Sequence, residues 1–312
     1  MGPKITTNMS DDQVRVMLWM VPRSLATAVL RSMSNLDNVK LINEPFVCAA
    51  SLGPDRVTSW NDEAIKILDK TLESLAGDAS DHKQYTFSWV KESLLEAPYT
   101  GKDVVFCKDT SASLVGKLNC IPKGYRHTFI IRHPNKVYKS WKDVVTKLAA
   151  GEQESLGLDT MLKMSGAEGY GYEEHYRLYE HVISMGIETD PVIIDADDLQ
   201  TNPEGTLRKY CEAVGIKYSD KLLSWAANQD AAEDWSMAEL QLKGHKMVGT
   251  YTAAFESVGF KKADNMDPPA RSELSDDILK CVDYAMPFYE KMLAKKIISI
   301  DNSTHRVRIS CT

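Results

Sequence analysis

The sequence lacks the cysteine and histidine patterns of disulfide scaffolds and metal centres. Six cysteines are scattered along the 312 residues, with no C-x-x-C pair and no histidine at metal-ligand spacing. Such isolated cysteines are typical of free thiols in a reducing compartment. Neither a disulfide framework nor a metal site is predicted. The cysteines are Cys48, Cys107, Cys120, Cys211, Cys281 and Cys311.

Long apolar runs and an excess of basic residues are also missing. No stretch approaches the roughly 20 apolar residues of a membrane helix, and residues 1–10 contain no apolar core of a secretory signal peptide. The 37 Lys and Arg residues against 44 Asp and Glu residues give a net charge of −7. We therefore expect a cytoplasmic protein that does not bind membranes and has no broad basic face for nucleic acid.

A glycine-rich nucleotide loop is the last missing pattern. The motif G-x-x-x-x-G-K-[ST] does not occur, because no glycine lies between Val21 and Met33. Gly116 and Lys117 are followed by Leu118, and no glycine stands five residues before Gly116. An ordinary ATPase loop is therefore excluded.

The sequence does contain a strand, a tight loop and a helix within residues 14–33. Residues 14–21 form a nearly unbroken apolar run, typical of a strand buried on both faces, and Pro22 ends it. Apolar residues then recur at helical spacing over residues 24–33. The start of this helix carries Arg23 and Thr27, and a helix N-terminus attracts anions. This stretch alone fits an anion site and a simple helix cap equally well.

Strand and helix patterns alternate along the chain. This alternation predicts a three-layer α/β fold in which a central, mostly parallel sheet of about five strands is flanked by helices. We expect a single domain over residues 1–312, with an α/β core at 14–216, a helical part at 217–295 and a tail at 296–312. The predicted strands are residues 14–21, 39–42, 103–107, 127–131 and 191–195.

Helices are expected where apolar residues recur at a period near 3.6. Residues 47–60 are expected to form a loop, and part of the polar, glycine-bearing stretch 151–171 is a candidate lid. The predicted helices are residues 24–33, 61–75, 85–96, 111–119, 134–149, 172–185, 203–215, 219–229, 240–257 and 275–295.

Polar residues stand where the predicted strands end. Glu44 follows the second strand, Lys108 the third and Arg132 the fourth. Ligands of open α/β sheets bind at the carboxyl ends of the strands. Ser140 lies eight residues after Arg132, on the following helix, so that both side chains can reach one phosphate. Taken singly, Arg132 also fits a surface cation and Ser140 an ordinary helix residue.

Together these segments resemble the sulfotransferases that use 3′-phosphoadenosine 5′-phosphosulfate (PAPS). P-R-S-L-A-T, residues 22–27, is similar to the 5′-phosphosulfate loop of that family. I-I-R-H-P-N-K-V-Y-K-S-W, residues 130–141, is similar to its 3′-phosphate strand and helix. Residues 194–216 are similar to a later family segment, and N-E-P-F, residues 43–46, to a Glu-Pro element of bacterial-type members.

The resemblance implies PAPS as sulfuryl donor, with no metal requirement. It implies a cofactor loop formed by Arg23, Ser24, Leu25, Ala26 and Thr27. It also implies that Arg132 and Ser140 bind the 3′-phosphate of the cofactor.

This sequence departs from the family pattern at several positions. Leu25 replaces the usual glycine of the loop, and Ala26 replaces a hydroxyl residue. Ala196 stands where a tyrosine often contacts adenine. The histidine base of cytosolic members has no counterpart after the third strand. The C-terminal R-K-G-x-x-G motif has only faint echoes, at residues 242–244 and 259–262.

The implied reaction is an in-line displacement at sulfur by a hydroxyl or amine of a small-molecule acceptor. We expect Arg23 to stabilise the leaving group, Lys108 to supply a second cation near it, and Glu44 to act as base. Glu44 also fits a structural ion pair with Arg23.

Two alternatives to a sulfotransferase stay open. One is a nucleotide-dependent small-molecule kinase, against which the missing glycine-rich loop weighs. The other is a catalytically inactive PAPS-binding or scaffold protein, which Leu25 and Ala26 favour. A homodimer also stays open.

Overall fold

The computed structural model describes residues 13–56, 70, 73–148, 157–261 and 266–297. The predicted helix at 61–75 lies largely outside these residues, as do part of the candidate lid and most of the predicted tail. Among the described helices, none is long and apolar enough to cross a lipid bilayer.

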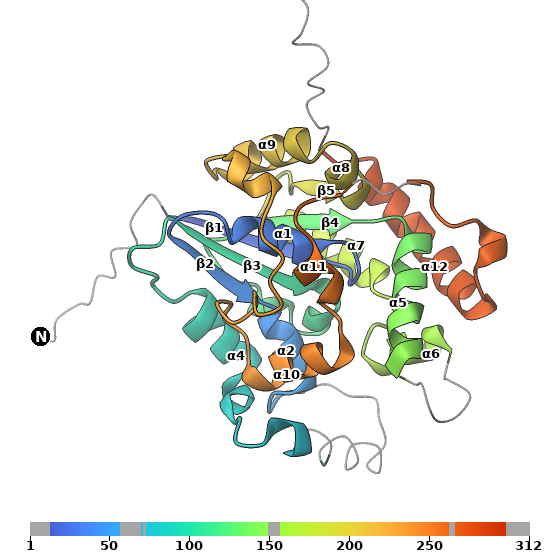
Figure 1. Ribbon diagram of the computed structural model, residues 1–312, viewed down its shortest axis with the longest axis horizontal. Coiled ribbons are helices and arrows are strands. Elements are labelled where there is room, and N and C mark those ends of the chain that lie inside the picture. Colours follow the sequence, from blue (N-terminus) through green and yellow to red (C-terminus); the bar gives the residue numbers. More distant parts are fainter. Residues whose placement is uncertain (1–12, 57–69, 71–72, 149–156, 262–265, 298–312) are drawn as a thin grey trace, which may run out of the picture.

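Five parallel strands form one sheet in the order β2–β3–β1–β4–β5, which confirms the predicted sheet (Figure 1). The chain leaves β1 toward β2 on one side and later adds β4 and β5 on the other. The carboxyl end of β1 therefore lies at the point where the strand order reverses, which is where such sheets bind ligands. The strands are β1 (Val14–Met20), β2 (Val39–Asn43), β3 (Val104–Thr110), β4 (Arg126–Ile131) and β5 (Ile193–Asp195).

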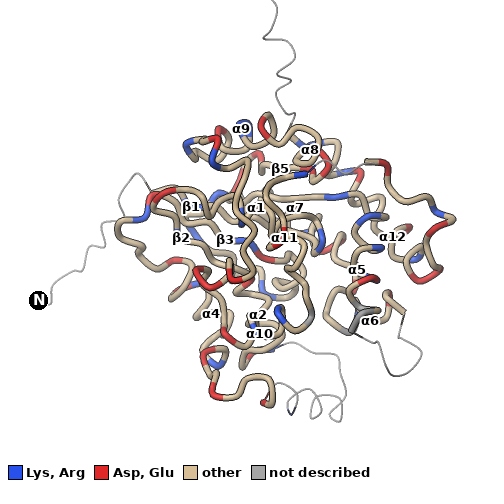
Figure 2. The backbone as a smooth tube through the Cα atoms, viewed as in Figure 1, with Lys and Arg blue, Asp and Glu red and all other residues tan. Residues whose placement is uncertain are grey.

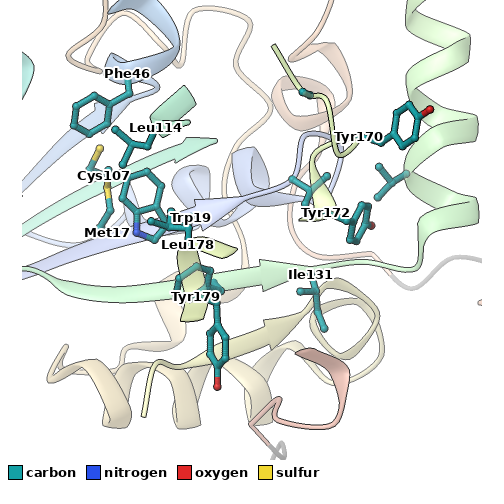
Figure 3. Packing of buried hydrophobic residues seen from close by; sticks show 14 of the residues in the cluster. Met17, Trp19, Phe46, Cys107, Leu114, Ile131, Tyr170, Tyr172, Leu178 and Tyr179 are labelled. Carbon is teal, nitrogen blue, oxygen red and sulfur yellow. The ribbon is translucent and has the colours of Figure 1, made fainter. Parts of the chain in front are cut away.

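Helices cover both faces of the sheet, which confirms the three-layer fold. Successive residues of a strand point to opposite faces, so Met17 and Trp19 enter one hydrophobic core (Figure 3) and Val16 and Leu18 the other. The Met17 side packs on α2 (Pro45–Ser51), α4 (Phe87–Trp89), α5 (Pro134–Leu148), α6 (Leu158–Met164), α7 (Tyr172–Ser184) and α12 (Asp276–Leu293). The Val16 side packs on α1 (Ala26–Met33), α8 (Ala196–Thr201), α9 (Pro203–Val214) and α11 (Thr252–Glu256).

The structure corrects two predictions in the first half of the chain. The segment expected as a loop from residue 47 begins instead with α2, whose first residue is Pro45, a favoured first helical residue. The helix expected at 111–119 is replaced by two short 3₁₀ turns, Ser111–Leu114 and Leu118–Cys120. The helix expected at 85–96 consists of α4 followed by a π-helical turn at Val90–Leu95.

Two further corrections fall in the last third. The helix expected at 219–229 is only a 3₁₀ turn, Asp220–Leu223. The apolar residues that suggested a helix include Leu222, which is buried in the core. The helix expected at 240–257 is divided into α10 (Glu239–Val248) and α11, because Gly249 adopts a left-handed conformation with φ of 71° and ends α10. This break turns the chain back toward the sheet edge that carries the site.

Candidate active site

The loop between β1 and α1 is built from two left-handed residues. Arg23 has φ of 70° and Leu25 has φ of 69°. Leu25 thus adopts the conformation for which the family uses glycine, at a cost of about 1–2 kcal/mol. α1 begins at Ala26, two residues later than predicted, and no side chain caps it. Its first amide groups are therefore free to bind an anion.

A cavity of about 320 Å³, which we call the cationic cavity, opens at this helix start. Arg23, Arg132 and Ser140, which the sequence placed at two separate anion sites, all line it. Neither guanidinium forms an ion pair with a carboxylate among the described residues. Other lining residues are Leu25, Ala26, Thr27, Ala28, Gln200, Thr250, Tyr251, Ser257, Gly259, Phe260 and Lys261.

Hydrogen bonds join the two predicted anion sites into one. Nε of Arg23 donates to Oγ of Ser140 at 3.1 Å, and the guanidinium also donates to the carbonyl of Thr250 at 2.8 Å. Arg132 donates to the carbonyl of Arg23 at 2.9 Å. Burial and the adjacent Arg132 guanidinium lower the pKa of Arg23. The two cations repel each other, and an anion between them would relieve that repulsion.

Two buried polar atoms at this loop have no hydrogen-bond partner within the described part of the chain: Oγ of Ser24 and Nε of Arg132. Such orphan atoms are rare in folded proteins and are often satisfied by a ligand. Ser24 is fully buried beneath the loop and, unlike the other six predicted cofactor residues, does not line the cavity.

Several surface charges outside the site form ion pairs. Basic and acidic residues alternate along α9 and α12 (Figure 2), and Arg208 of α9, for example, pairs with Glu204 at 2.9 Å. Arg23 and Arg132 differ from these surface residues in that they are largely buried and line a cavity.

Of the two weak matches to the R-K-G-x-x-G motif, at residues 242–244 and 259–262, only the second contributes to the cationic cavity. Gly259, Phe260 and Lys261 line the cavity, whereas Lys243 turns away to the carbonyl of Ala76 at 2.8 Å. Lys262 lies outside the described residues. A side chain at Gly259 would lie 2.7 Å from the carbonyl oxygen of Leu223, so glycine is needed at this edge of the cavity.

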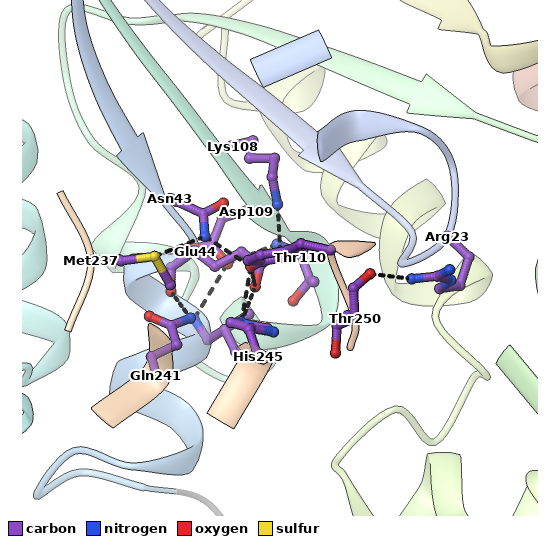
Figure 4. A network of polar contacts seen from close by, with 12 residues as sticks. Arg23, Asn43, Glu44, Lys108, Asp109, Thr110, Met237, Gln241, His245 and Thr250 are labelled. Carbon is purple, nitrogen blue, oxygen red and sulfur yellow. Dashed lines mark hydrogen bonds and ion pairs between the residues drawn. The ribbon is translucent and has the colours of Figure 1, made fainter. Parts of the chain in front are cut away.

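Glu44 lies at the centre of a buried polar network (Figure 4). One carboxylate oxygen accepts a hydrogen bond from Lys108 Nζ at 2.5 Å. The other accepts from the hydroxyl of Tyr251 at 3.0 Å and lies 3.3 Å from Nε2 of His245. Glu44 thus forms its ion pair with Lys108 rather than with Arg23, and its second oxygen contacts Tyr251 and His245. Burial raises the pKa of Glu44, but the charge of Lys108 and the interactions with His245 outweigh burial and lower it.

Lys108 and Asp109 lie inside β3, which extends three residues beyond its predicted end. The Lys108 side chain is completely buried, and its ammonium lies 5.3 Å from the centre of the Tyr251 ring. Lys108 lines neither cavity of the site, so direct contact with a leaving group stays a prediction. Asp109 accepts backbone hydrogen bonds from Phe46 and Val47 and thereby anchors the start of α2.

A second cavity of about 510 Å³, which we call the apolar cavity, meets the first at Glu44. Met20, Pro22, Glu44 and Thr250 line both cavities. The remaining walls are largely apolar and come from α2, the 3₁₀ turn Ser111–Leu114, α5, α6 and the turn before α7. They include Val47, Leu52, Ala112, Val115, Trp141, Leu162, Ala167 and Tyr170, together with His245.

His245 and Tyr251 are site residues that the sequence did not indicate. Both fall in the segment expected as one continuous helix, and nothing in its periodicity distinguishes them from surface or core residues. The described residues contain no group of three or more His, Cys, Asp or Glu side chains that could hold a metal ion.

Comparison with known families finds a similarity that covers part of the chain. A family model described as a sulfotransferase domain matches residues 178–296. The predicted resemblance to sulfotransferases is thereby confirmed, and the matched stretch contains His245, Tyr251 and the cavity residues 259–261. This match supports sulfotransfer as the general class of activity.

Two curated proteins of Arabidopsis thaliana are also similar. Branched-chain-amino-acid aminotransferase-like protein 2 is 27% identical over 212 residues, and protein 1 of the same description is 25% identical over 215 residues. Each alignment covers 67% of this chain and 31% of the relative. The chain thus spans about a third of the length of these relatives.

Solved structures show more distant similarity. The sulfotransferase domain from the curacin biosynthetic pathway aligns with a TM-score of 0.43 and 14% identity, covering 87% of this chain and 96% of that one. A sulfotransferase from Alicyclobacillus acidocaldarius aligns with a TM-score of 0.40 and 13% identity, covering 77% and 95%. Similarity at this level adds nothing to the assignment.

Proposed function

We propose that this protein transfers a sulfuryl group from PAPS to a hydroxyl or amine of a small-molecule acceptor. The observation that carries the proposal is the pair of guanidiniums, Arg23 and Arg132, which face one cavity at the start of α1 without a carboxylate partner among the described residues. Two fixed cations and a helix N-terminus suit a ligand that carries several anionic groups.

PAPS fits the cationic cavity by the chemistry of its walls. The amides of Ala26, Thr27 and Ala28 and the guanidinium of Arg23 would hold the phosphosulfate. Arg132 and Ser140 would hold the 3′-phosphate, and the orphan Nε of Arg132 would gain an acceptor. Phe260 and Gln200 would contact the adenosine end.

The acceptor would occupy the apolar cavity, because that cavity meets the first one at Glu44. An acceptor with an apolar body would pack against Trp141 and Leu162, while its hydroxyl or amine pointed toward Glu44. Since both the α/β core and the helical part line the cavities, we treat residues 14–295 as one functional unit.

The residues of the chain would supply electrostatic stabilisation and proton transfer. Negative charge builds on the bridging oxygen of the leaving group, and Arg23 with the α1 amides would stabilise it. Lys108 would act through Glu44, whose charge it neutralises at 2.5 Å. Glu44 would take part in removing the acceptor proton. The cytoplasmic location, the homodimer and the exclusion of nucleic acid stay predictions.

Binding of adenosine 3′,5′-bisphosphate, the expected product, tests the proposal directly. At a hundred times its dissociation constant the ligand should stabilise the fold by about 2.7 kcal/mol, which a thermal-shift assay detects. Arg132→Gln should weaken this binding about 100-fold, as expected for the loss of one charged donor worth roughly 3 kcal/mol. Isothermal titration calorimetry measures the change.

Arg126→Gln is the matched control, because Arg126 begins β4 at the opposite edge of the sheet and its side chain is 47% exposed. Its affinity for the bisphosphate should equal that of the wild type. A wild-type protein that binds neither PAPS nor the bisphosphate would overturn the proposal. Stabilisation by ATP with Mg²⁺ alone would favour the kinase alternative.

A further inference from the structure

His245 stands at the wall between the two cavities. It lies on α10, lines the apolar cavity, and its side chain is 17% exposed. Its Nε2 atom is 2.9 Å from the hydroxyl oxygen of Tyr251 and 3.3 Å from the second carboxylate oxygen of Glu44 (Figure 4). The imidazole also stacks on the Tyr251 ring, with centroids 4.1 Å apart. Three contacts with two residues therefore fix the orientation of the ring.

The hydrogen bonds around Tyr251 determine which nitrogen of His245 carries the proton. The hydroxyl of Tyr251 has one hydrogen, and the Glu44 carboxylate accepts it at 3.0 Å. Burial and the nearby Glu44 carboxylate raise the pKa of Tyr251 well above its usual value, so the phenol keeps that hydrogen. The Tyr251 oxygen also accepts from Nδ2 of Asn43 at 2.8 Å. Nε2 of His245 faces this oxygen and a carboxylate oxygen of Glu44, which can only accept, so Nε2 carries the proton and the lone pair of neutral His245 lies on Nδ1. No described residue is hydrogen-bonded to Nδ1.

Glu44 is less suited to accept a proton itself. Lys108 engages one of its oxygens, and Tyr251 and His245 engage the other. Although burial alone raises the pKa of Glu44, Lys108 and His245 lower it below the usual value for glutamate. A carboxylate that holds its charge so firmly is a weak base at neutral pH.

We propose that His245, through Nδ1, is the catalytic base that takes the acceptor proton, an inference that rests on the proposed sulfuryl transfer. The acceptor oxygen forms a new bond to sulfur while the bond from sulfur to the bridging phosphate oxygen breaks. The acceptor proton moves to Nδ1, and adenosine 3′,5′-bisphosphate leaves. The products are the sulfated acceptor, the bisphosphate and a protonated imidazole, which returns its proton to solvent.

Glu44 and Tyr251 are positioning residues in this arrangement. They hold the Nε2–H group of His245 and thereby keep the lone pair on Nδ1, facing away from the ion pair. The negative charge of Glu44 also stabilises the imidazolium that forms. This assigns to α10 the histidine that has no counterpart after β3.

Two acceptors that differ in protonation test the assignment in the 312-residue chain. Phenol is protonated in mildly alkaline solution and needs a base, whereas 4-nitrophenol is largely ionised there and does not. His245→Gln should lower turnover of phenol roughly 10²- to 10⁴-fold and affect 4-nitrophenol far less. Affinity for the bisphosphate should not change, since His245 does not line the cationic cavity. His181→Gln, at the far end of α7, is the control and should match the wild type.

Nitrogen NMR of ¹⁵N-histidine-labelled protein supplies a readout that needs no acceptor. The His245 signals, identified by their loss in His245→Gln, should show Nε2 protonated and Nδ1 unprotonated. A proton on Nδ1, or equal losses for phenol and 4-nitrophenol, would overturn the base assignment. If neither phenol is sulfated, the NMR measurement of which His245 nitrogen carries the proton tests the base assignment by itself. Failure to bind the bisphosphate would instead contradict the proposed sulfotransferase function.

Discussion

The two cavities that meet at Glu44 differ in their chemistry. The cationic cavity presents Arg23, Arg132 and Lys261 to its interior, and Glu44 is its one carboxylate among the described lining residues. The apolar cavity is larger and is walled mainly by aliphatic and aromatic side chains such as Trp141 and Leu162. A polyanion and an apolar molecule could therefore bind side by side and react where the walls meet.

The contrast explains why the polar network lies between the cavities. A carboxylate facing the cationic cavity alone would compete with an anionic ligand for Arg23 and Arg132. Lys108 prevents this by neutralising Glu44 through a buried ion pair, and His245 lines the apolar cavity next to that pair. The boundary can therefore accept a proton without repelling the donor.

The largest expected effect follows from breaking this boundary. Glu44→Gln leaves the fully buried ammonium of Lys108 without a counter-ion. Because an uncompensated buried charge is strongly destabilising, we expect the free energy of unfolding to fall by roughly 3–5 kcal/mol. Denaturation by urea measures the loss.

The double variant Glu44→Gln with Lys108→Met serves as the control for that prediction. It removes both charges and should recover most of the lost stability, since a buried ion pair can be replaced at little net cost. Glu204→Gln, which breaks an exposed pair on α9, should change stability little. A double variant as unstable as Glu44→Gln would show that the charge balance is not the cause.

The second effect concerns acid pH at the same boundary. The pKa of Glu44 is lower in the folded than in the unfolded protein. Its contribution to stability is therefore fully present above the unfolded pKa of about 4.3 and is lost as the pH falls through the lower folded-state value. The unfolding free energy of the wild type should drop more steeply below about pH 4.3 than that of Glu44→Gln. Equal slopes would mean that Glu44 is not held ionised.

The third effect separates the two cavities. Trp141 and Ser140 are neighbours on α5, but Ser140 lines the cationic cavity and Trp141 the apolar one. Trp141→Ala should raise the KM for an aromatic acceptor about tenfold, equivalent to about 1.4 kcal/mol, and leave the affinity for the bisphosphate unchanged. Steady-state kinetics and calorimetry test the two parts. Equal weakening of both ligands would show that the cavities do not act separately.

The part of the cationic cavity formed by residues 22–27, Arg132 and Ser140 was predictable from the sequence because its motifs are local, whereas the wall formed by residues 250–261 was not. A helix start after a strand, or an arginine eight residues before a serine, can be recognised from a short stretch of sequence. The sheet order then brings the carboxyl ends of β1 and β4 together. Even so, no sequence pattern indicated that Arg23 and Ser140 share a hydrogen bond.

The apolar cavity and the polar network were not predictable, because their residues come from distant segments. His245 and Tyr251 reach Glu44 across about 200 positions of the chain, and Tyr251 follows directly on the break at Gly249 that ends α10. Lys108 was expected beside the leaving group, but β3 extends beyond its predicted end and directs the side chain to Glu44. Apolar walls such as Val47 and Leu162 carry no pattern that distinguishes them from core residues.

The smallest effect concerns the strained loop itself. Leu25 lines the cationic cavity in a left-handed conformation that favours glycine. Leu25→Gly and Leu25→Ala both remove the side chain, but only glycine relieves the backbone strain of about 1–2 kcal/mol. Glycine also makes the unfolded chain more flexible, which costs about 0.5–1 kcal/mol. The glycine variant should therefore be more stable than the alanine variant by up to about 1 kcal/mol, as measured by urea denaturation. An alanine variant of equal or greater stability would show that the loop leaves the left-handed conformation once the leucine side chain is gone.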